Sequence, residues 1–383
     1  MKKCLIISFF NSHNIGDRII ALSLANRYQK HFNVVKCSFE GTLNIWPEDK
    51  YNYGIKDDLK IIYGSCFTKL HKVFLKKKNK EIVLDDTIKR EIENCDFLCI
   101  GGGNMLMYDY YRMFYSYVNY AKKCNKNVLA VDVGVGPFSS KEQLLNTCKC
   151  LDMCDSVTFR DKSSLELAKK HCISDKLFLA VDPCFLLDNK KTVYHENSFV
   201  AINILDFSLD FATKEMQKYM LEAYEALVKE LAQVSAKKIV LFSTVYEDYR
   251  VIHKLAKRLS RNGINIEIRK VYTINDLNEL YQNTCYVVAM RMHALILAYS
   301  FGIPHCGIAW QKKVESFFAI TKHEENCFDV SQFKNQIQNI VSLFEKSQIT
   351  GFPKIETAKE ILDLGAVDSE IISEFIGEEN AKM

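Results

Sequence analysis

The sequence predicts an α/β protein built from two Rossmann-like domains, each a doubly wound parallel sheet, that face each other across a cleft. Short apolar runs alternate with helical patterns along most of the 383 residues, and glycines follow several of these runs. The alternation lapses into a polar connection at residues 187–197 and then resumes. Strand–turn–helix alternation is typical of parallel sheets with helices on both faces. We therefore predict a first domain at residues 1–190, a second at residues 191–350 and a helical tail at residues 351–383.

The first domain is predicted from short, mostly apolar runs whose length suits strands buried on both faces of a sheet. We expect these strands at residues 5–10, 33–40, 96–100, 128–133, 156–159 and 177–180. Between them, apolar residues recur at helical spacing, which predicts helices at residues 19–31, 107–124, 144–154 and 163–171. Residues 11–18 are then a loop between the first strand and the first helix.

The second domain repeats the same alternation. We expect strands at residues 199–203, 238–243, 265–269, 286–289 and 306–309, and helices at residues 214–232, 249–261, 274–283 and 294–301. Residues 292–311 contain no Asp, Glu, Lys or Arg, which raises the question of a membrane span. Two histidines and the turn from Gly302 to Pro304 argue against one. A short buried helix, a turn and a buried strand fit this stretch better.

Composition excludes several classes of protein. Hydrophobic residues make up 48% and charged residues 26% of the chain, as in ordinary soluble globular proteins. The net charge of +4 is too small to predict nucleic acid as a partner. The cluster of Cys148, Cys150 and Cys154 has no matching Cys/His set, so we expect no metal site. Unpatterned cysteines and the absence of a cleavage-site pattern near the N-terminus predict a cytoplasmic protein.

One segment combines basic and apolar residues. Residues 70–80 read LHKVFLKKKNK. A solvated helix face is the favoured interpretation, and the alternative is a patch that contacts the inner surface of a membrane.

Two glycine-containing segments in the first domain could contact a ligand. Asn14 and Gly16 lie just after the first strand, where the backbone can pass close to an anion at a helix N-terminus. Asp17 beside them could act as a base or could cap the helix. The run Gly101-Gly102-Gly103-Asn104 follows the third strand, and its bare N–H groups suit a phosphate or a carboxylate. The alternative for this run is a tight strand-to-helix turn.

Cationic residues at strand ends are the other candidates. Arg160 follows a strand and could bind a carboxylate or phosphate, or could pair with Asp161 at the surface. Arg291 and His293 lie between two apolar segments, where buried polar groups are costly without a function. Arg291 supplies a permanent charge, and His293 can carry a proton near neutral pH or can be a core histidine. Lys313 follows the next strand and could add charge to the same place.

Taken in order, these motifs resemble those of the polysaccharide pyruvyl transferases. The resemblance covers residues 1–320 and includes Asn14-Ile15-Gly16-Asp17, Gly101-Gly102-Gly103-Asn104, Arg160-Asp161-Lys162-Ser163-Ser164, Val181-Asp182-Pro183-Cys184-Phe185, Arg291-Met292-His293, Gly302-Ile303-Pro304 and Lys313-Val314. It implies a GT-B-like fold and a phosphoenolpyruvate donor without a further cofactor. It also implies transfer of pyruvate as a ketal to a sugar of a cell-surface polysaccharide precursor, either free or lipid-linked.

The resemblance also implies roles for single residues. Arg291, His293 and Arg160 would hold the phosphate and the carboxylate of the donor. In the family a tyrosine usually stands four residues before the late lysine, whereas here Trp310 stands three before Lys313. Ketal formation needs proton transfers, and His293 and Asp17 are the candidate carriers. Two other functions stay open: a GT-B glycosyltransferase that uses a nucleotide sugar, and a non-catalytic protein that binds a sugar or phosphate.

Overall fold

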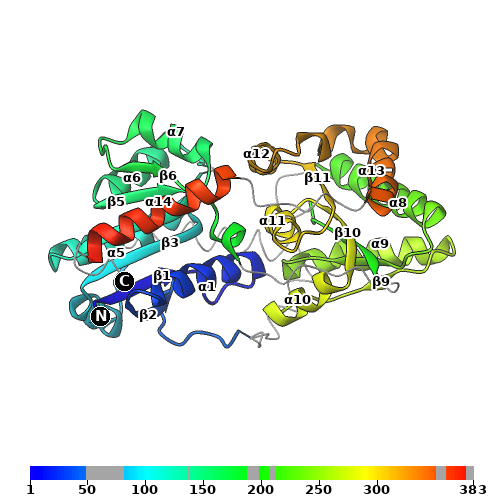
Figure 1. The fold of residues 1–383 in the computed structure, drawn as a ribbon. Coiled ribbons are helices and arrows are strands. Elements are labelled where there is room, and N and C mark those ends of the chain that lie inside the picture. Colours follow the sequence, from blue (N-terminus) through cyan, green and yellow to red (C-terminus); the bar gives the residue numbers. More distant parts are fainter. Residues whose placement is uncertain (49–81, 137, 188–197, 208–212, 351–358, 377–383) are drawn as a thin grey trace.

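The computed structural model describes residues 1–48, 82–136, 138–187, 198–207, 213–350 and 359–376. Two six-stranded sheets, each with all strands parallel, form the centres of two bodies that lie side by side (Figure 1). Helices flank both sheets, so the predicted pair of Rossmann-like α/β domains is confirmed. The chain passes from the first sheet to the second between residues 179 and 199, through the short helix η2 (Pro183–Leu186).

The first sheet has the strand order β2-β1-β3-β4-β5-β6. Its strands are β1 (Lys3–Ser8), β2 (Asn33–Ser38), β3 (Phe97–Leu106), β4 (Asn127–Val135), β5 (Ser156–Phe159) and β6 (Leu177–Leu179). Its helices are α1 (Ile15–Gln29), α4 (Asp86–Asn94), α5 (Tyr111–Lys123), α6 (Lys141–Asp152) and α7 (Lys162–His171). Leu5 and Ile7 face one side of the sheet, and Cys4 and Ile6 face the other, so both faces are buried.

The second sheet has the strand order β12-β11-β10-β7-β8-β9. Its strands are β7 (Phe199–Asn203), β8 (Ile239–Phe242), β9 (Glu267–Ile268), β10 (Thr284–Ala289), β11 (His305–Ala309) and β12 (Cys327–Asp329). Its helices are α8 (Lys214–Val234), α9 (Tyr249–Arg261), α10 (Ile274–Gln282), α11 (Met292–Ser300), α12 (Lys312–Thr321) and α13 (Ile337–Thr350). The predicted helix, turn and strand within residues 292–311 are confirmed as α11 and β11.

In each sheet, the side on which successive strands are added changes at one place. The reversal lies between β1 and β3 in the first sheet and between β7 and β10 in the second. Open parallel sheets bind ligands in the crevice outside the strand ends at such a switch point. Asn14 follows β1, and Arg291 follows β10, so each switch point holds residues that the sequence singled out.

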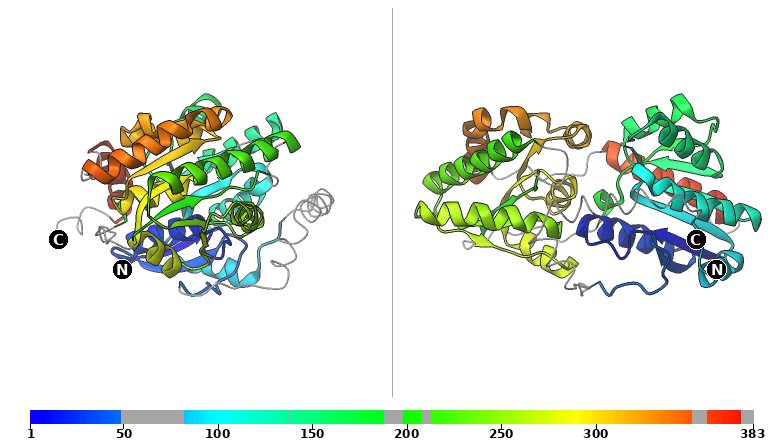
Figure 2. Two further views of the ribbon diagram at one scale, coloured as in Figure 1. Left: turned by 90° about the vertical axis from the view of Figure 1, so that its right-hand side faces the viewer. Right: turned by 180° about the vertical axis from the view of Figure 1, so that it is seen from behind.

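The two domains share apolar packing. Ile15 and Ile19 of α1 belong to the same buried cluster as Val181 before η2 and Ala294 of α11. Helix α14 (Lys359–Ile376) returns from the second domain and lies against the first, beside β6 (Figures 1 and 2). Its Ile371 is buried against the sheet face that includes Cys4 and Ile6. The chain therefore crosses between the domains twice.

Two local predictions are wrong. Helix α1 begins at Ile15, not at residue 19, because Asn14 caps it: the Asn14 side chain accepts a hydrogen bond from the Gly16 N–H at 3.0 Å. Asp17 therefore lies inside the first turn and is not the cap. The run Gly101-Gly102-Gly103-Asn104 is not a turn either, because β3 continues through it to Leu106 and pairs with β4.

Candidate functional site between the two domains

The glycines of β3 allow close packing. A Cβ on Gly101 would lie 1.9 Å from the carbonyl oxygen of Val131, and one on Gly102 would lie 2.6 Å from Cγ2 of Ile20. Gly102 and Gly103 also have φ values of +78° and +93°, which side chains disfavour. Tight contact of β3 with β4 and α1 therefore explains these glycines. Binding of a ligand by Gly102 and Gly103 stays a prediction.

The first turn of α1 forms a small polar cluster at the first switch point. Asn14 donates from Nδ2 to the Asp17 carboxylate at 3.0 Å. A Cβ on Gly103 would lie 3.7 Å from the Asp17 carboxylate, so Asp17 faces β3. The predicted residues Asn14, Gly16, Asp17 and Gly103 are thus brought together.

This turn also joins the domains directly. The Ile15 N–H donates to the carbonyl oxygen of Thr244 at 3.0 Å, and Asn14 forms a backbone bridge with Val245. Gly16 lies against the imidazole of His293, such that a Cβ on Gly16 would be 2.4 Å from Nδ1. A glycine at this position is therefore what lets α1 reach the second domain.

Arg160 lies at the centre of a second polar cluster. Its Nη1 donates to Asp182 at 2.8 Å, and its Nη2 donates to Oδ1 of Asn104 at 2.6 Å. Asp161 instead caps α7 by accepting from the Ser164 N–H at 2.8 Å. The alternative of a surface pair between Arg160 and Asp161 is therefore wrong, because Arg160 is buried and has a different partner.

His293 joins this cluster from the second domain. Its Nε2 lies 3.5 Å from Oδ2 of Asp182, the oxygen that also accepts from Arg160. Burial alone would raise the pKa of the Asp182 carboxyl, but the nearby imidazole of His293 and the Arg160 guanidinium hold it well below its usual range. Asp182 is therefore ionised and links Arg160 to His293.

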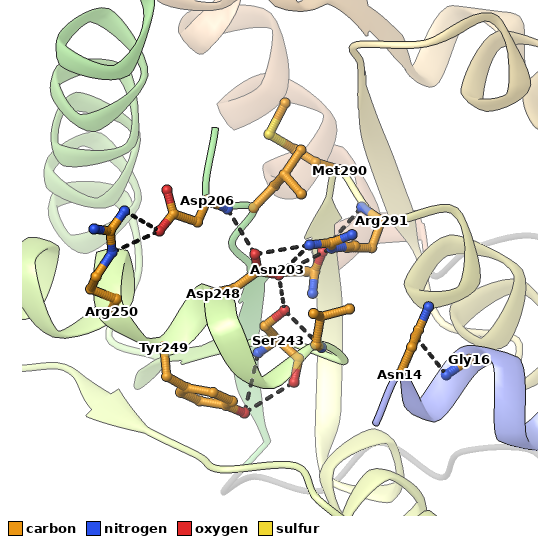
Figure 3. A network of polar contacts seen from close by, with 12 residues as sticks. Asn14, Gly16, Asn203, Asp206, Ser243, Asp248, Tyr249, Arg250, Met290 and Arg291 are labelled. Atoms are coloured by element: carbon orange, nitrogen blue, oxygen red, sulfur yellow. Dashed lines mark hydrogen bonds and ion pairs between the residues drawn. The ribbon is translucent and has the colours of Figure 1, made fainter. Parts of the chain in front are cut away.

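Arg291 has a partner of its own at the second switch point. Its Nε donates to Asp248 at 3.0 Å and its Nη2 donates to both oxygens of that carboxylate at 2.8 Å (Figure 3). Ser243 donates to the same carboxylate, and the Arg291 N–H donates to Asn203. Burial raises the pKa of Asp248 although Arg291 lowers it. Among the described residues none accepts from Nη1 of Arg291, and binding of a ligand by this residue stays a prediction.

A cavity of about 690 Å³ lies beside Arg160, between the domains. Three predicted residues, Asn104, Arg160 and Lys313, are in its wall. Its other polar lining residues come from both domains and include Lys162, Ser163, Ser164, Asp182, Lys312 and Lys322. Its apolar wall includes Phe185, Met292, Ile296, Phe317, Ile320 and, from α14, Leu364. The cavity thus combines a cationic part with an apolar part.

The N-terminus of α12 opens on this cavity. Its N-cap residue, Gln311, makes no side-chain capping bond, whereas Asp161 already occupies the N-terminus of α7. Lys313 lies in the first turn of α12, with its Nζ 5.7 Å from the centre of the Trp310 ring. Free N–H groups at a helix N-terminus and adjacent lysines attract anions. This end of the cavity therefore suits a phosphate or a carboxylate.

Two partners in the site escaped the sequence analysis. Asp182 is 22 residues from Arg160, and Asp248 is 43 residues from Arg291, so neither pair has a local signal. Asp182 appears in a motif of the resemblance, but its partners become visible only in the fold. Within the described ranges no group of three His, Cys, Asp or Glu residues lies close enough to hold a metal ion. Residues 70–80 lie outside the described residues, and in the described part no helix is both long and apolar enough to span a bilayer.

Two parallel α/β domains that meet at their switch points define a GT-B-like protein, the class also seen in the solved structures that this chain resembles. The Anabaena protein HepE in complex with UDP-glucose is 10% identical, with a TM-score of 0.56 over 97% of this chain and 100% of that one. The UDP-GlcNAc 2-epimerase of Neisseria meningitidis is 11% identical, with a TM-score of 0.54 over 97% and 99%. An α-glucosyltransferase bound to UDP and DNA is 10% identical, with a TM-score of 0.53 over 98% and 99%.

Within that class the sequence identifies a narrower group. The model of the polysaccharide pyruvyl transferase family matches residues 14–312, and the chain belongs to this family. The matched range contains Asn14 and the Arg291–His293 segment and ends just before Lys313. No curated protein sequence matches the chain.

Proposed function

We propose that this protein transfers the pyruvyl group of phosphoenolpyruvate to two hydroxyls of one sugar in a cell-surface polysaccharide or its precursor, forming a pyruvate ketal. The observation that carries the proposal is the interdomain cavity, where Asn104, Arg160 and Lys313 line the wall near the open N-terminus of α12. Phosphoenolpyruvate presents a carboxylate and a phosphate, which bind best to cationic side chains and backbone N–H donors. Membership of the family supports the same donor.

The reaction balances without a cofactor. A proton adds to the methylene carbon of phosphoenolpyruvate, and the first hydroxyl oxygen bonds to the adjacent carbon, C2. The bond from C2 to the phosphate oxygen then breaks, inorganic phosphate leaves, and the second hydroxyl oxygen bonds to C2. The two hydroxyl protons balance the proton gained by the methyl group and the proton that leaves with phosphate.

We assign the proton transfers to residues at the interdomain contact. His293 protonates the methylene carbon, and Asp17 removes a proton from a hydroxyl. The contact of Gly16 with His293 supports this assignment, because it brings the first turn of α1, which carries Asp17, against the imidazole. Arg291 binds the donor through Nη1, because its Nε and Nη2 already donate to Asp248.

The apolar wall of the cavity extends the proposal to the acceptor. Phosphoenolpyruvate has no apolar body to cover Phe185, Met292 and Ile296. We therefore propose an acceptor sugar on a lipid carrier, with the first carbons of the lipid against this wall. Such an acceptor would place the protein in the cytoplasm at the inner face of the membrane.

Mass spectrometry tests the reaction. The protein is incubated with phosphoenolpyruvate and a panel of synthetic and lipid-linked glycosides. We expect one glycoside to gain the mass of one pyruvate minus one water, with release of inorganic phosphate. Phosphoenolpyruvate should also raise the melting temperature. Protection by UDP with glycosyl transfer from a UDP-sugar would overturn the proposal in favour of a glycosyltransferase, and donor binding without any product would favour a binding protein.

Charge variants test where the donor binds. Lys312→Ala and Lys313→Ala remove cations at the N-terminus of α12. We expect both to raise the KM for phosphoenolpyruvate, and high salt to reduce the difference from the wild type. Lys257→Ala on α9 is the matched control, since this exposed lysine does not line the cavity. Equal KM values in all four proteins would place the donor elsewhere.

A further inference from the structure

The Asp182 carboxylate lies between Arg160 of the first domain and His293 of the second, two side chains that the proposed reaction uses. We infer that Asp182 is a positioning residue that holds Nε2–H of His293 and Nη1 of Arg160, so that Nδ1 of His293 exchanges the proton with the substrate. This inference rests on the proposed function for the part that concerns substrate. The part that concerns the ring of His293 stands on geometry alone.

Both carboxylate oxygens of Asp182 have polar neighbours that restrict the side chain to one orientation. Its side chain is 2% exposed, and Oδ2 lies 2.8 Å from Nη1 of Arg160 and 3.5 Å from Nε2 of His293. Its other oxygen accepts from the Cys184 N–H at 3.1 Å. Arg160 comes from the end of β5 and His293 from the first turn of α11, so the carboxylate fixes two elements of different domains.

The ring of His293 has few choices of tautomer. Nε2 is buried without a well-aligned hydrogen-bond partner among the described residues, and Oδ2 of Asp182 lies 3.5 Å from it. An unprotonated Nε2 would direct its lone pair at an ionised carboxylate, which is unfavourable, whereas a protonated Nε2 points a hydrogen at it. The neutral ring therefore carries its proton on Nε2. Nδ1 lies on the side of Gly16, toward the first turn of α1.

Substitution by asparagine removes the charge and keeps the shape. Asp182→Asn should lower kcat by up to about 10⁴-fold, the loss that follows when the carboxylate that orients a catalytic histidine is replaced by its amide. Arg160 loses its counter-ion as well but keeps its own charge for the donor, so KM for phosphoenolpyruvate should change less than kcat. Asp132→Asn is the matched control, since Asp132 is also buried and paired with an arginine, Arg27, but does not line the cavity.

Nitrogen NMR of the histidines gives a readout that needs no substrate. His293 is assigned by comparison with His293→Gln. We expect the wild type to show the Nε2–H tautomer of His293, Asp182→Asn to shift this ring toward the Nδ1–H tautomer, and Asp132→Asn to leave it unchanged. An Nδ1–H tautomer in the wild type overturns the inference, even where Asp182→Asn does not fold. An unchanged ring in Asp182→Asn overturns it too.

The two proposals fail in different ways. If the ring shifts as expected but no glycoside gains pyruvate, the proposed function is wrong and the role of Asp182 in holding the ring stands. If pyruvate is transferred but Asp182→Asn changes neither the tautomer of His293 nor kcat, the positioning role is wrong and the proposed function stands.

Discussion

Gly16 and His293 touch across the two domains, with so little space between them that a methyl group on Gly16 would lie 2.4 Å from Nδ1 of the imidazole. The contact places the proposed proton carrier directly against the first turn of α1. Its geometry depends on the docking of the domains, because Gly16 belongs to the first and His293 to the second.

Gly16→Ala should lower both activity and stability. Within a helix, alanine is normally more stable than glycine by about 1 kcal/mol. Here the new methyl group would displace His293, and a misplacement of about 1 Å can lower the rate about 10²-fold. Thermal unfolding and kcat are the measurements. Asn26→Ala on the same helix is the control, because Asn26 is exposed to solvent. A more stable and fully active Gly16→Ala would show that the contact is looser than described.

His293→Gln should lower kcat by about 10²–10⁴-fold, the usual loss when a general acid is removed. The melting temperature should stay close to that of the wild type, and KM for phosphoenolpyruvate should change less than kcat. Both quantities are measured on one preparation. A core histidine predicts the reverse pattern, a lower melting temperature with normal turnover for each folded molecule.

Arg291→Ala should destabilise the protein because it leaves Asp248 buried without its counter-ion. Loss of one partner of a buried pair typically costs about 3–5 kcal/mol in the free energy of unfolding. Adding Asp248→Asn removes the unpaired charge and should recover most of that stability. It should not restore donor binding, so KM for phosphoenolpyruvate stays high in the double variant. A normal KM there would show that Arg291 does not contact the donor.

His305 should make the free energy of unfolding depend on pH. Burial lowers the pKa of His305 from 6.5 to about 4 in the folded protein. Between these values the unfolded chain binds a proton that the folded protein does not, so the free energy of unfolding falls as the pH decreases from 6.5 to 4. The loss should total about 3 kcal/mol, at about 1.4 kcal/mol for each pH unit. Urea unfolding at several pH values measures it, and His305→Gln should flatten the slope. An equal slope in both proteins would exclude His305 as the cause.

Regular alternation made most of the fold predictable. The strands at residues 156–159 and 199–203 and the helix at residues 249–261 match the structure at both ends. The glycine run of β3 was misassigned, because residues without side chains carry no periodic signal, and only the packing of α1 shows why a strand continues there. Helix α4 was missed, since its short sequence has just two buried residues, Ile88 and Ile92.

The site was predictable to a different degree. Arg160 and His293 stood out because charged or titratable groups at apolar strand ends are unusual. Their common partner, Asp182, did not stand out, because an aspartate before a proline is ordinary in a turn. Arg291 was expected to help hold the donor, and its partner Asp248, which accepts from two of its three nitrogens, was not foreseen. Such pairings depend on the order of strands in the sheet, which no local pattern encodes.

The position of helix α14 affects the order in which the domains fold during synthesis on the ribosome. The face of the first sheet that includes Cys4 and Ile6 is covered in part by Ile371, which is synthesised after the entire second domain. During translation, part of this apolar face therefore stays exposed to solvent until the second domain and α14 have been synthesised. A nascent chain stalled before α14 should therefore recruit chaperones to the first domain, and α14 supplied later as a separate peptide should release them.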